Sequence, residues 1–280
     1  MQLTFSKMHG LGNDFVILER ISRDFTLTAK RIAQLSDRRT GIGFDQLLVA
    51  DLPTRPDADF YYQIYNADGS VAEQCGNGAR CFARFVIDRK LTTKRQLVLE
   101  TSTGLISTTL LPSGQVEVAM GAPVLDCAEI PYVPEQTIAT DQHARQVTLD
   151  GSVTEFVPVS MGNPHAVIQV DNVRDAPLTT VGAQLAAHPS FPAGVNVGFS
   201  QIVDREFLRL RVLERGVGET RACGTGACAA VVAGILTGQL DNKVKVALAG
   251  GNLRIVWQGL GEAVKMTGSA TLVYNGEFKT

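Results

Sequence analysis

A short motif built on cysteine occurs twice in this chain, and the duplication constrains the fold more than any other feature. Residues 75–78 read CGNG and residues 223–226 read CGTG, so each cysteine is followed by glycine, a polar residue and a second glycine. A polar side chain precedes each cysteine by nine residues, Asn66 in the first case and Glu214 in the second. The constant separation of 148 residues indicates two copies of one structural unit.

Two further matches occur in the same order along the chain. Residues 12–13 (GN) recur at 162–163, with an offset of 150, and residues 43–46 (GFDQ) recur as GFSQ at 198–201, with an offset of 155. Three ordered matches at nearly one spacing favour a duplicated lobe over chance similarity among glycine-rich loops. Two copies are too few for a solenoid. We therefore expect two similar lobes that face each other across a cleft lined by matched loops.

Length and composition exclude several classes of protein. The chain has 280 residues, of which 45% are hydrophobic and 19% charged, as is typical of a folded protein long enough for two domains. Lys and Arg number 26 against 28 Asp and Glu, so no electrostatic attraction to nucleic acid or an anionic membrane is expected. The apolar run at 227–236 is too short to cross a bilayer. Residues 1–9 lack the pattern of a signal peptide, so a cytoplasmic location is the default expectation.

Local patterns predict strands interspersed with a few helices. Residues 28–37 predict a helix capped by Thr28, with Ile32 and Leu35 facing inward. Helices are also expected after each cysteine motif. The second of these, around residues 227–233, is apolar on every side, so strands should surround it. Apolar and β-branched runs predict strands at residues 16–18, 46–49, 60–65, 97–100, 106–110, 116–118, 166–170 and 207–212.

These patterns together favour an α+β fold with two pseudo-symmetric lobes. Each lobe should be a mixed or antiparallel sheet curled around a central helix, with the active site in the cleft between the lobes. We expect residues 1–119 to form the N-terminal lobe and residues 120–266 the C-terminal lobe. The last strand, within residues 267–280, is expected to rejoin the first lobe.

Each cysteine motif combines features that suit acid–base chemistry on an anionic substrate. The first N–H groups of a helix have no intrahelical partner and carry partial positive charge, so they can hold a carboxylate. The same position favours thiolate, because a cysteine pKa of about 8.5 falls to about 3.5–7.5 at helix N-termini. Two facing motifs could place an α-carbon between two sulfurs. One thiolate would then remove the α-proton and the opposite thiol would return a proton to the other face. The carbanion's charge would spread onto the carboxylate held by the helix amides.

A structural role for the cysteines is the alternative, since cysteine is often simply buried. We interpret Cys81, Cys127 and Cys228 in this way. The number of cysteines, five, is odd and the chain is long, which argues against a disulfide framework. No C-x-x-C pair occurs, which argues against a zinc knuckle. The internal repeat is what favours a catalytic role for Cys75 and Cys223.

Several motifs identify the chain as similar to a known enzyme family. Over nearly its whole length the chain resembles diaminopimelate epimerase, through residues 7–15 (KMHGLGNDF), 66–70 (NADGS), 75–80 (CGNGAR), 162–165 (GNPH), 214–220 (ERGVGET) and 223–226 (CGTG). The resemblance implies conversion of LL-2,6-diaminopimelate to the meso isomer, in the synthesis of lysine and of a peptidoglycan precursor. It also implies that the isomerase needs neither pyridoxal phosphate nor a metal, and that it forms a homodimer with Tyr274 at the interface.

The resemblance further implies roles for individual residues. Cys75 and Cys223 would be the acid–base pair. His165 and Glu214 would tune thiol pKa values. The expected substrate-binding residues are Asn13, Gln46, Asn66, Gly76, Asn77, Asn163, Asn196, Glu214, Arg215, Gly224 and Thr225.

Residue chemistry is compatible with several of these roles. The adjacent Glu214 and Arg215 offer an anion and a cation to a distal amino-acid group, and arginine can hold a carboxylate with two hydrogen bonds. The asparagines could equally form turns. Recurrence in the repeat favours binding for most of them, whereas Asn196 rests on the resemblance alone. His165 could tune a neighbouring thiol or could merely complete a buried hydrogen bond.

Three alternative functions remain open at this point. A proline racemase-like enzyme would share the two cysteines but would have no use for the charged pair Glu214 and Arg215. A non-catalytic amino-acid-binding protein would need the anion-binding loops but not the sulfurs. A thiol oxidoreductase would turn over disulfides. The sequence also leaves open which cysteine is the resting thiolate.

Overall fold

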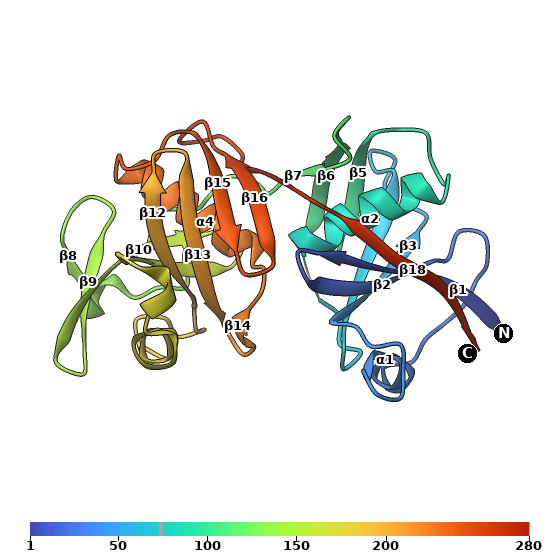
Figure 1. Cartoon of the computed structure of the whole chain (residues 1–280), viewed down its shortest axis with the longest axis horizontal. Coiled ribbons are helices and arrows are strands. Elements are labelled where there is room, and N and C mark those ends of the chain that lie inside the picture. Colours follow the sequence, from blue (N-terminus) through green and yellow to red (C-terminus); the bar gives the residue numbers. More distant parts are fainter. Residues whose placement is uncertain (73–74, 280) are drawn as a thin grey trace. The chain divides into compact units, whose positions relative to one another are not determined.

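The computed structural model describes residues 1–72 and 75–279. The chain divides into two compact units (Figure 1). One consists of Met1–Ala119 together with Thr267–Thr280, and the other of Met120–Met266. Among the described residues, no helix is both long and apolar enough to span a membrane.

The first unit is one mixed sheet whose strands are joined partly by helical crossovers. In spatial order its strands are β18, β1, β2, β3, β4, β5, β6 and β7, with β2–β3 and β4–β5 parallel and the other neighbours antiparallel. Figure 1 shows β18, in red, alongside β1, in dark blue. Their bounds are β1 (Gln2–Gly10), β2 (Asn13–Glu19), β3 (Gln46–Asp51), β4 (Phe60–Asn66), β5 (Gln96–Thr101), β6 (Gly104–Leu110), β7 (Val116–Ala119) and β18 (Thr271–Lys279).

Helix α1 (Ala29–Ser36) lies in the crossover from β2 to β3 and forms as its sequence predicts. The Thr28 hydroxyl caps the helix by accepting from the Arg31 N–H at 3.2 Å. Ile32 and Leu35 are buried in a core that also contains Phe44. This confirms the expected cap and the expected inward face of the helix.

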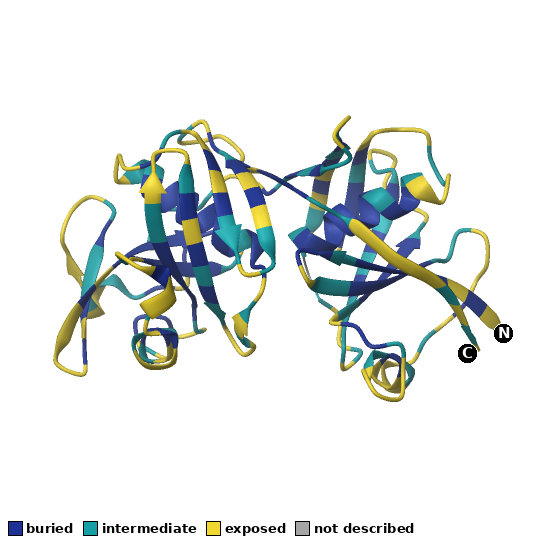
Figure 2. Cartoon of the chain, viewed as in Figure 1, coloured by how far each residue is buried: buried dark blue, intermediate teal, exposed yellow. Residues whose placement is uncertain are grey.

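Helix α2 (Gly76–Asp88) lies in the crossover from β4 to β5 and forms the centre of the first unit. It packs against β1, β2, β3, β6 and β7, so the sheet curls around it. Phe82 and Phe85 are buried, and the Phe82 ring lies 4.8 Å from that of Tyr62 on β4. Figure 2 shows most of this helix as buried.

The second unit repeats this plan with more strands. Its strands pair in the order β8, β9, β10, β11, β12 and β13, and β13 continues to β14 on one stretch and to β15 and β16 on another. β11–β12 and β13–β15 are parallel. The bounds are β8 (Ile138–Ala139), β9 (Arg145–Leu149), β10 (Ser152–Ser160), β11 (Pro164–Gln169), β12 (Asn196–Asp204), β13 (Phe207–Glu214), β14 (Gly218–Thr220), β15 (Lys243–Leu248), β16 (Gly251–Val256) and, across the boundary between the units, β17 (Lys265–Gly268).

Short helical segments fill the loops of the second unit, and one long helix fills its core. The short segments are η1 (Pro134–Gln136), η2 (Val173–Asp175), η3 (Leu178–Gly182) and α3 (Ala183–Ala186). Helix α4 (Gly224–Leu236) packs against β10 to β13, β15 and β16. Residues Ala227 to Gly234 are all buried, which confirms that this all-apolar helix is surrounded by strands. Gly234 is needed there because a Cβ at this position would lie 2.3 Å from Leu240.

Strand registers show how far the two units repeat each other. Phe15 pairs with Gln46 across β2 and β3, and His165 pairs with Asn196 across β11 and β12, an offset of 150 at both positions. The structural counterpart of Gln46 is therefore Asn196. The sequence match that aligned Gln46 with Gln201 is wrong, because it shifts the pairing by five residues. The expected α+β class, with a mixed sheet around a central helix in each unit, is confirmed.

Candidate active site

Both motif cysteines occupy the same structural position, the N-cap of a thirteen-residue central helix. Cys75 precedes α2 and Cys223 precedes α4, each with extended backbone. The first helical bonds close from Ala79 N to Cys75 O at 2.8 Å and from Ala227 N to Cys223 O at 3.0 Å. The first N–H groups of a helix have no intrahelical partner and attract anions, so each sulfur lies beside a potential anion site. In α2 the Gly78 N–H itself donates to the Cys75 sulfur.

The last glycine of each motif is closely packed, tightly enough at Gly78 to exclude a side chain. A Cβ on Gly78 would lie 2.2 Å from the Tyr62 hydroxyl. A Cβ on Gly226 would lie 3.0 Å from Val212 and 3.2 Å from the Cys223 sulfur. In each unit, a side chain from a strand next to the helix therefore reaches the first helical turn.

In the first unit the structure brings Asn13, Cys75 and Asn77 together. Cys75 is half-buried, and its Sγ accepts from the Gly78 N–H at 3.3 Å and contacts Asn13 Oδ1 at 3.8 Å. The Asn77 amide donates to the same Asn13 oxygen at 3.2 Å. Tyr62 donates to the carbonyl of Cys75 at 3.2 Å, which holds the N-cap residue against β4.

Gln46 and Asn66 form a second polar pair in this unit. They face each other across β3 and β4, and Gln46 Nε2 donates to Asn66 Oδ1 at 3.0 Å. The Asn66 amide also donates to Ser70 Oγ at 3.1 Å, within a turn whose Gly69 has a φ of +85°. Asn66 thus contributes to a turn as well as to the pair, and its turn role alone would explain its residue type.

In the second unit Cys223 is buried beside Thr225 and Glu214. Its sulfur lies 3.6 Å from Thr225 Oγ1. Burial raises the pKa of the Cys223 thiol well above its ordinary range, and Glu214 raises it further through its charge and by accepting from the thiol. Contacts with Thr225 and the Gly226 N–H lower this pKa, but burial dominates. The expectation that the helix N-terminus would lower the pKa of both cysteines is therefore wrong for Cys223, because desolvation of the thiolate outweighs the helix amides.

Asn196 joins β11 to the end of β13. Its Nδ2 donates to Pro164 O at 3.2 Å and its Oδ1 accepts from the Arg215 N–H at 2.9 Å. The exposed Arg215 side chain in turn donates to Ala193 O at 2.6 Å. The carboxylate of Glu214 accepts from Thr220. The side chains of Glu214 and Arg215 are thus each held by a hydrogen bond, and Asn196 holds the backbone N–H of Arg215.

The buried His165 pairs with the half-buried Asn163. The two side chains meet at 3.1 Å between Nε2 and Oδ1, and an amide oxygen can only accept, so Nε2 carries the proton. In the part of the chain that the structure describes, Nδ1 has no hydrogen-bond partner. Burial lowers the pKa of His165 to about 3, so the ring is neutral at physiological pH. Of the two roles expected for His165, the buried hydrogen bond is the one with an observed partner.

The remaining residues singled out from the sequence lie outside these clusters. Cys81 is fully buried, which raises its pKa to about 12, and Cys228 is also buried. Cys127 is half-buried against the core of the second unit. Tyr274 lies on β18 with 44% of its surface exposed, and its ring makes a T-shaped contact with that of Phe5.

Sequence reasoning did not single out Asp45 and Arg80 as site residues. Asp45 accepts from the Asn13 amide at 2.9 Å, and the fully buried Arg80 donates to Asn77 Oδ1 at 2.9 Å. Both lie inside quoted motifs, GFDQ and CGNGAR. Each is a charged residue within a motif that also holds a proposed binding amide, Gln46 or Asn77, and this proximity could have marked both as site residues.

Several solved structures share the fold of this chain. A hydroxyproline epimerase from Agrobacterium vitis, with bound trans-4-hydroxy-L-proline, aligns with a TM-score of 0.68 at 15% identity, covering 99% of this chain and 92% of that one. A phenazine biosynthesis protein of the PhzF family from Bacillus anthracis gives 0.67 at 15% identity, with both chains fully covered. A methylitaconate-delta-isomerase gives 0.64 at 14% identity, covering 99% and 95%. The chain therefore has the fold shared by these proteins.

Sequence comparison defines the family within this fold. The family model described as diaminopimelate epimerase matches residues 5–125 and 157–273. Diaminopimelate epimerases from Ectopseudomonas mendocina (strain ymp) and Azotobacter vinelandii (strain DJ / ATCC BAA-1303) are each 53% identical over 279 residues, with both chains fully covered. The chain belongs to the diaminopimelate epimerase family. The resemblance noted from the motifs is thus confirmed over the whole chain.

Proposed function

We propose that this protein converts LL-2,6-diaminopimelate to the meso isomer by passing an α-proton between two cysteines. The observation that carries the proposal is the pair of cysteines that cap matched central helices. The identity of 53% with curated diaminopimelate epimerases over the full chain supports the substrate. The activity would be that of an isomerase in lysine and peptidoglycan-precursor synthesis.

The proposed reaction uses the two sulfurs in opposite roles. The buried Cys223, beside Glu214, holds its proton and suits the acid in the direction in which Cys75 is the base. Cys75 takes the α-proton and Cys223 donates one to the opposite face, so the proton count is unchanged and the configuration inverts. The reverse direction exchanges the roles. The mechanism requires both sulfurs to reach one α-carbon during the reaction.

The developing charge needs stabilisation by oriented donors. A carboxylate that accepts from the N–H groups of Gly76 and Asn77 on α2 and of Gly224 and Thr225 on α4 would receive negative charge from the carbanion. Donors fixed at helix termini do not have to reorganise as this charge forms. The proposal therefore requires no pyridoxal phosphate and no metal.

The distal amino-acid group of the substrate carries one positive and one negative charge. Arg215 offers an exposed guanidinium to its carboxylate, and Glu214 offers an anion to its ammonium. Asn196 would act here mainly by holding the Arg215 backbone. Asn13, Gln46, Asn66 and Asn163 complete the proposed binding set, and His165 would support it through Asn163.

The same set of residues distinguishes the rival functions. A racemase with a single-centre substrate such as proline would have no need for the anchored Glu214 and Arg215 pair. A binding protein would have no need for sulfur at both helix N-caps. We extend the proposal to a cytoplasmic homodimer that acts on a small molecule, with β18 as its interface. Leu272, Val273 and Tyr274 expose 44%, 55% and 44% of their surfaces there.

Proton exchange in D₂O tests the proposed activity. Reduced protein is incubated with LL-diaminopimelate in D₂O without pyridoxal phosphate, and deuterium uptake and the meso isomer are measured together. We expect both in the wild type, and a loss of about 10²-fold or more in Cys75→Ala and in Cys223→Ala. Cys127→Ala, which removes a half-buried cysteine outside the motifs, is the matched control and should retain activity. Reduced, folded wild type without exchange would exclude diaminopimelate, and proline would be tried next.

A further inference from the structure

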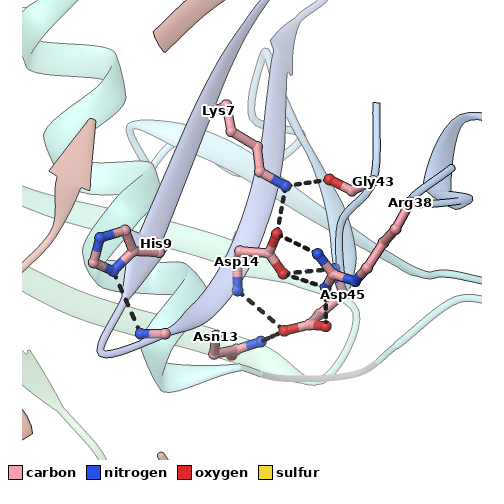
Figure 3. Close-up of polar contacts among 8 residues, drawn as sticks. Lys7, His9, Asn13, Asp14, Arg38, Gly43 and Asp45 are labelled. Carbon is pink, nitrogen blue, oxygen red and sulfur yellow. Dashed lines mark hydrogen bonds and ion pairs between the residues drawn. The ribbon is translucent and has the colours of Figure 1, made fainter. Parts of the chain in front are cut away.

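We infer that Asp45 is a positioning residue that sets the orientation of the Asn13 amide at Cys75. Its consequence for catalysis rests on the proposed function, but the inferred geometry does not. Figure 3 shows Asp45 beside Asn13, Asp14 and Arg38. The Asp45 carboxylate would thus influence the Cys75 sulfur through Asn13, without contacting the sulfur itself.

The orientation follows from what each group can donate or accept. Asp45 Oδ2 accepts from Asn13 Nδ2 at 2.9 Å. An ionised carboxylate has no proton to give, so the amide must turn its NH₂ group toward Asp45. The amide oxygen then points away from Asp45, toward Cys75 Sγ at 3.8 Å.

Arg80 fixes the orientation of the Asn77 amide, which contacts the Asn13 amide from the other side. Arg80 is fully buried and can only donate, and its Nη2 meets Asn77 Oδ1 at 2.9 Å. The Asn77 NH₂ group therefore faces Asn13 Oδ1, at 3.2 Å. Gly10 permits this approach, because a Cβ there would lie 3.0 Å from Arg80 Nη2. Arg80, which can only donate, and the Asp45 carboxylate, which can only accept, thus fix the orientations of the side-chain amides beside Cys75.

Asp45 is itself held by groups outside the site. Arg38 Nη2 lies 2.7 Å from Asp45 Oδ1, and the Asp14 N–H donates to Oδ2 at 3.1 Å. Arg38 also binds both oxygens of Asp14, to which Lys7 donates as well. Burial acts to raise the pKa of Asp14, but hydrogen bonds from Arg38 and Lys7 hold it well below its usual range. Asp14 therefore stays charged across the physiological pH range and keeps its hold on Arg38, which binds Asp45.

The internal repeat shows that Asp45 and Arg80, which orient the amides at Cys75, have no charged counterparts in the second unit. At the offset of 150 that relates β3 to β12, the counterpart of Asp45 is Val195. At the offset of 148 that relates the helices, the counterpart of Arg80 is Cys228. Cys75 therefore faces an amide oxygen held by Asp45, whereas Cys223 faces the Glu214 carboxylate. Two cysteines in equivalent positions are thus tuned by different acceptors.

Among the described residues that bear on Cys75, Tyr62 and Cys81 should not confuse its titration. Burial raises the pKa of Tyr62 well above its usual range, and that of Cys81 to about 12, so both stay neutral near pH 7. Arg80 stays charged. His9 lies at the same hairpin, where its Nδ1 accepts from the Gly12 N–H at 3.4 Å. A His9→Gln background removes that imidazole from the measurement.

Two substitutions separate amide orientation from simple charge. Asp45→Ala removes both the carboxylate charge and the acceptor for Asn13. Asp45→Asn removes the charge but keeps an oxygen, which the Asp14 N–H can still orient toward the Asn13 amide. Asp57→Ala removes an exposed carboxylate paired with Arg55 in the same unit, and serves as the matched control.

Alkylation of each cysteine by iodoacetamide against pH, followed by peptide mass spectrometry, provides a readout independent of turnover. In Asp45→Ala we expect the midpoint of Cys75 alkylation to fall by about half a pH unit, because an acceptor for the neutral thiol is no longer held in place. The Cys223 midpoint should not move. We expect kcat for diaminopimelate to fall about tenfold with KM within about threefold, since positioning is lost rather than binding. Asp45→Asn should stay close to the wild type.

Two results would overturn the inference. One is a Cys75 midpoint and a kcat in Asp45→Ala that match those of Asp57→Ala. The other is equal effects of Asp45→Asn and Asp45→Ala, which would assign the effect to charge alone. If the wild type lacks exchange but Cys75 responds to Asp45→Ala as expected, the proposed function fails while the geometry inferred here stands.

Discussion

At the scale of single residues, the two motif cysteines have equal positions but unequal surroundings. Cys75 is half-buried against amides, and Cys223 is buried beside a carboxylate. Desolvation and a nearby negative charge both disfavour thiolate. The structure therefore indicates that Cys223 is the thiol that keeps its proton in the unliganded protein, a point on which the sequence was silent.

His165 should make the second unit sensitive to acid. Its pKa is about 3 when folded against 6.5 for a free side chain, so the unfolded chain takes up the proton first as pH falls. Stability is full above about pH 6.5 and is lost as pH falls from there toward about 3. Between about pH 7.5 and about pH 5, urea unfolding should show a loss about 1.5–2 kcal/mol larger in the wild type than in His165→Gln.

The comparison of His165→Gln with the wild type isolates this histidine from other acid-sensitive groups. His143→Gln, at a half-buried loop position, is the control and should behave as the wild type does. Parallel pH dependence in the wild type and His165→Gln would mean that the ring protonates in the folded state without penalty, which would contradict its burial.

At the scale of elements, the two central helices were the most predictable parts of the fold. A glycine-bearing motif followed by an apolar segment predicts a helix start from local preferences alone. Helix α1 was equally predictable, because Thr28, Ile32 and Leu35 follow the spacing of a capped amphipathic helix. β1 and β12 are among the strands that were not predicted, whereas a last strand was expected within residues 267–280, where β18 lies. Polar residues interrupt β1, and β18 exposes most of its side chains, so neither shows a clear alternating pattern.

The matched helix N-termini should respond differently to one added methyl group. Gly78→Ala would place Cβ 2.2 Å from the Tyr62 hydroxyl, whereas Gly226→Ala would meet Val212 at 3.0 Å. We expect Gly78→Ala to lower the free energy of unfolding by about 1–3 kcal/mol, and Gly226→Ala to lower it by less. Urea unfolding of both variants measures the difference.

A double variant tests the cause of the Gly78→Ala effect. Tyr62→Phe removes the hydroxyl that the new Cβ would meet, so Gly78→Ala should cost less stability in that background. An equal cost in both backgrounds would show that the helix backbone, rather than the tyrosine, resists the substitution.

At the scale of the whole molecule, the duplicated plan survives great sequence divergence. The fold is shared with a hydroxyproline epimerase and a methylitaconate-delta-isomerase at 14–15% identity. Within this chain, the strand registers repeat at an offset of 150 although few residue types are shared. Backbone pairing and a buried central helix therefore define the fold more than particular side chains do.

The proposed homodimer predicts an effect of charge on β18. Tyr274→Glu places a carboxylate among the exposed Leu272 and Val273, and its desolvation would oppose association. Light scattering after size exclusion should show two chains for the wild type and one for Tyr274→Glu. Val217→Glu, at an apolar position that is 73% exposed in the second unit, should leave the mass unchanged. A monomeric wild type at micromolar concentration would contradict the proposed interface.

Features that depend on neighbours along the chain could be predicted from the sequence alone. The doubled cysteine motif, the capped helix α1 and the all-apolar helix α4 follow from local preferences and periodicity, and the long motifs identified the family. Features that depend on partners far apart in sequence became visible only in the folded chain. The match of Gln46 to Asn196 needed the strand registers, and the link from Asp45 to Cys75 needed β2 beside α2. The raised pKa of Cys223 depends on burial, which overrides the local influence of the helix terminus because the interior solvates charge poorly.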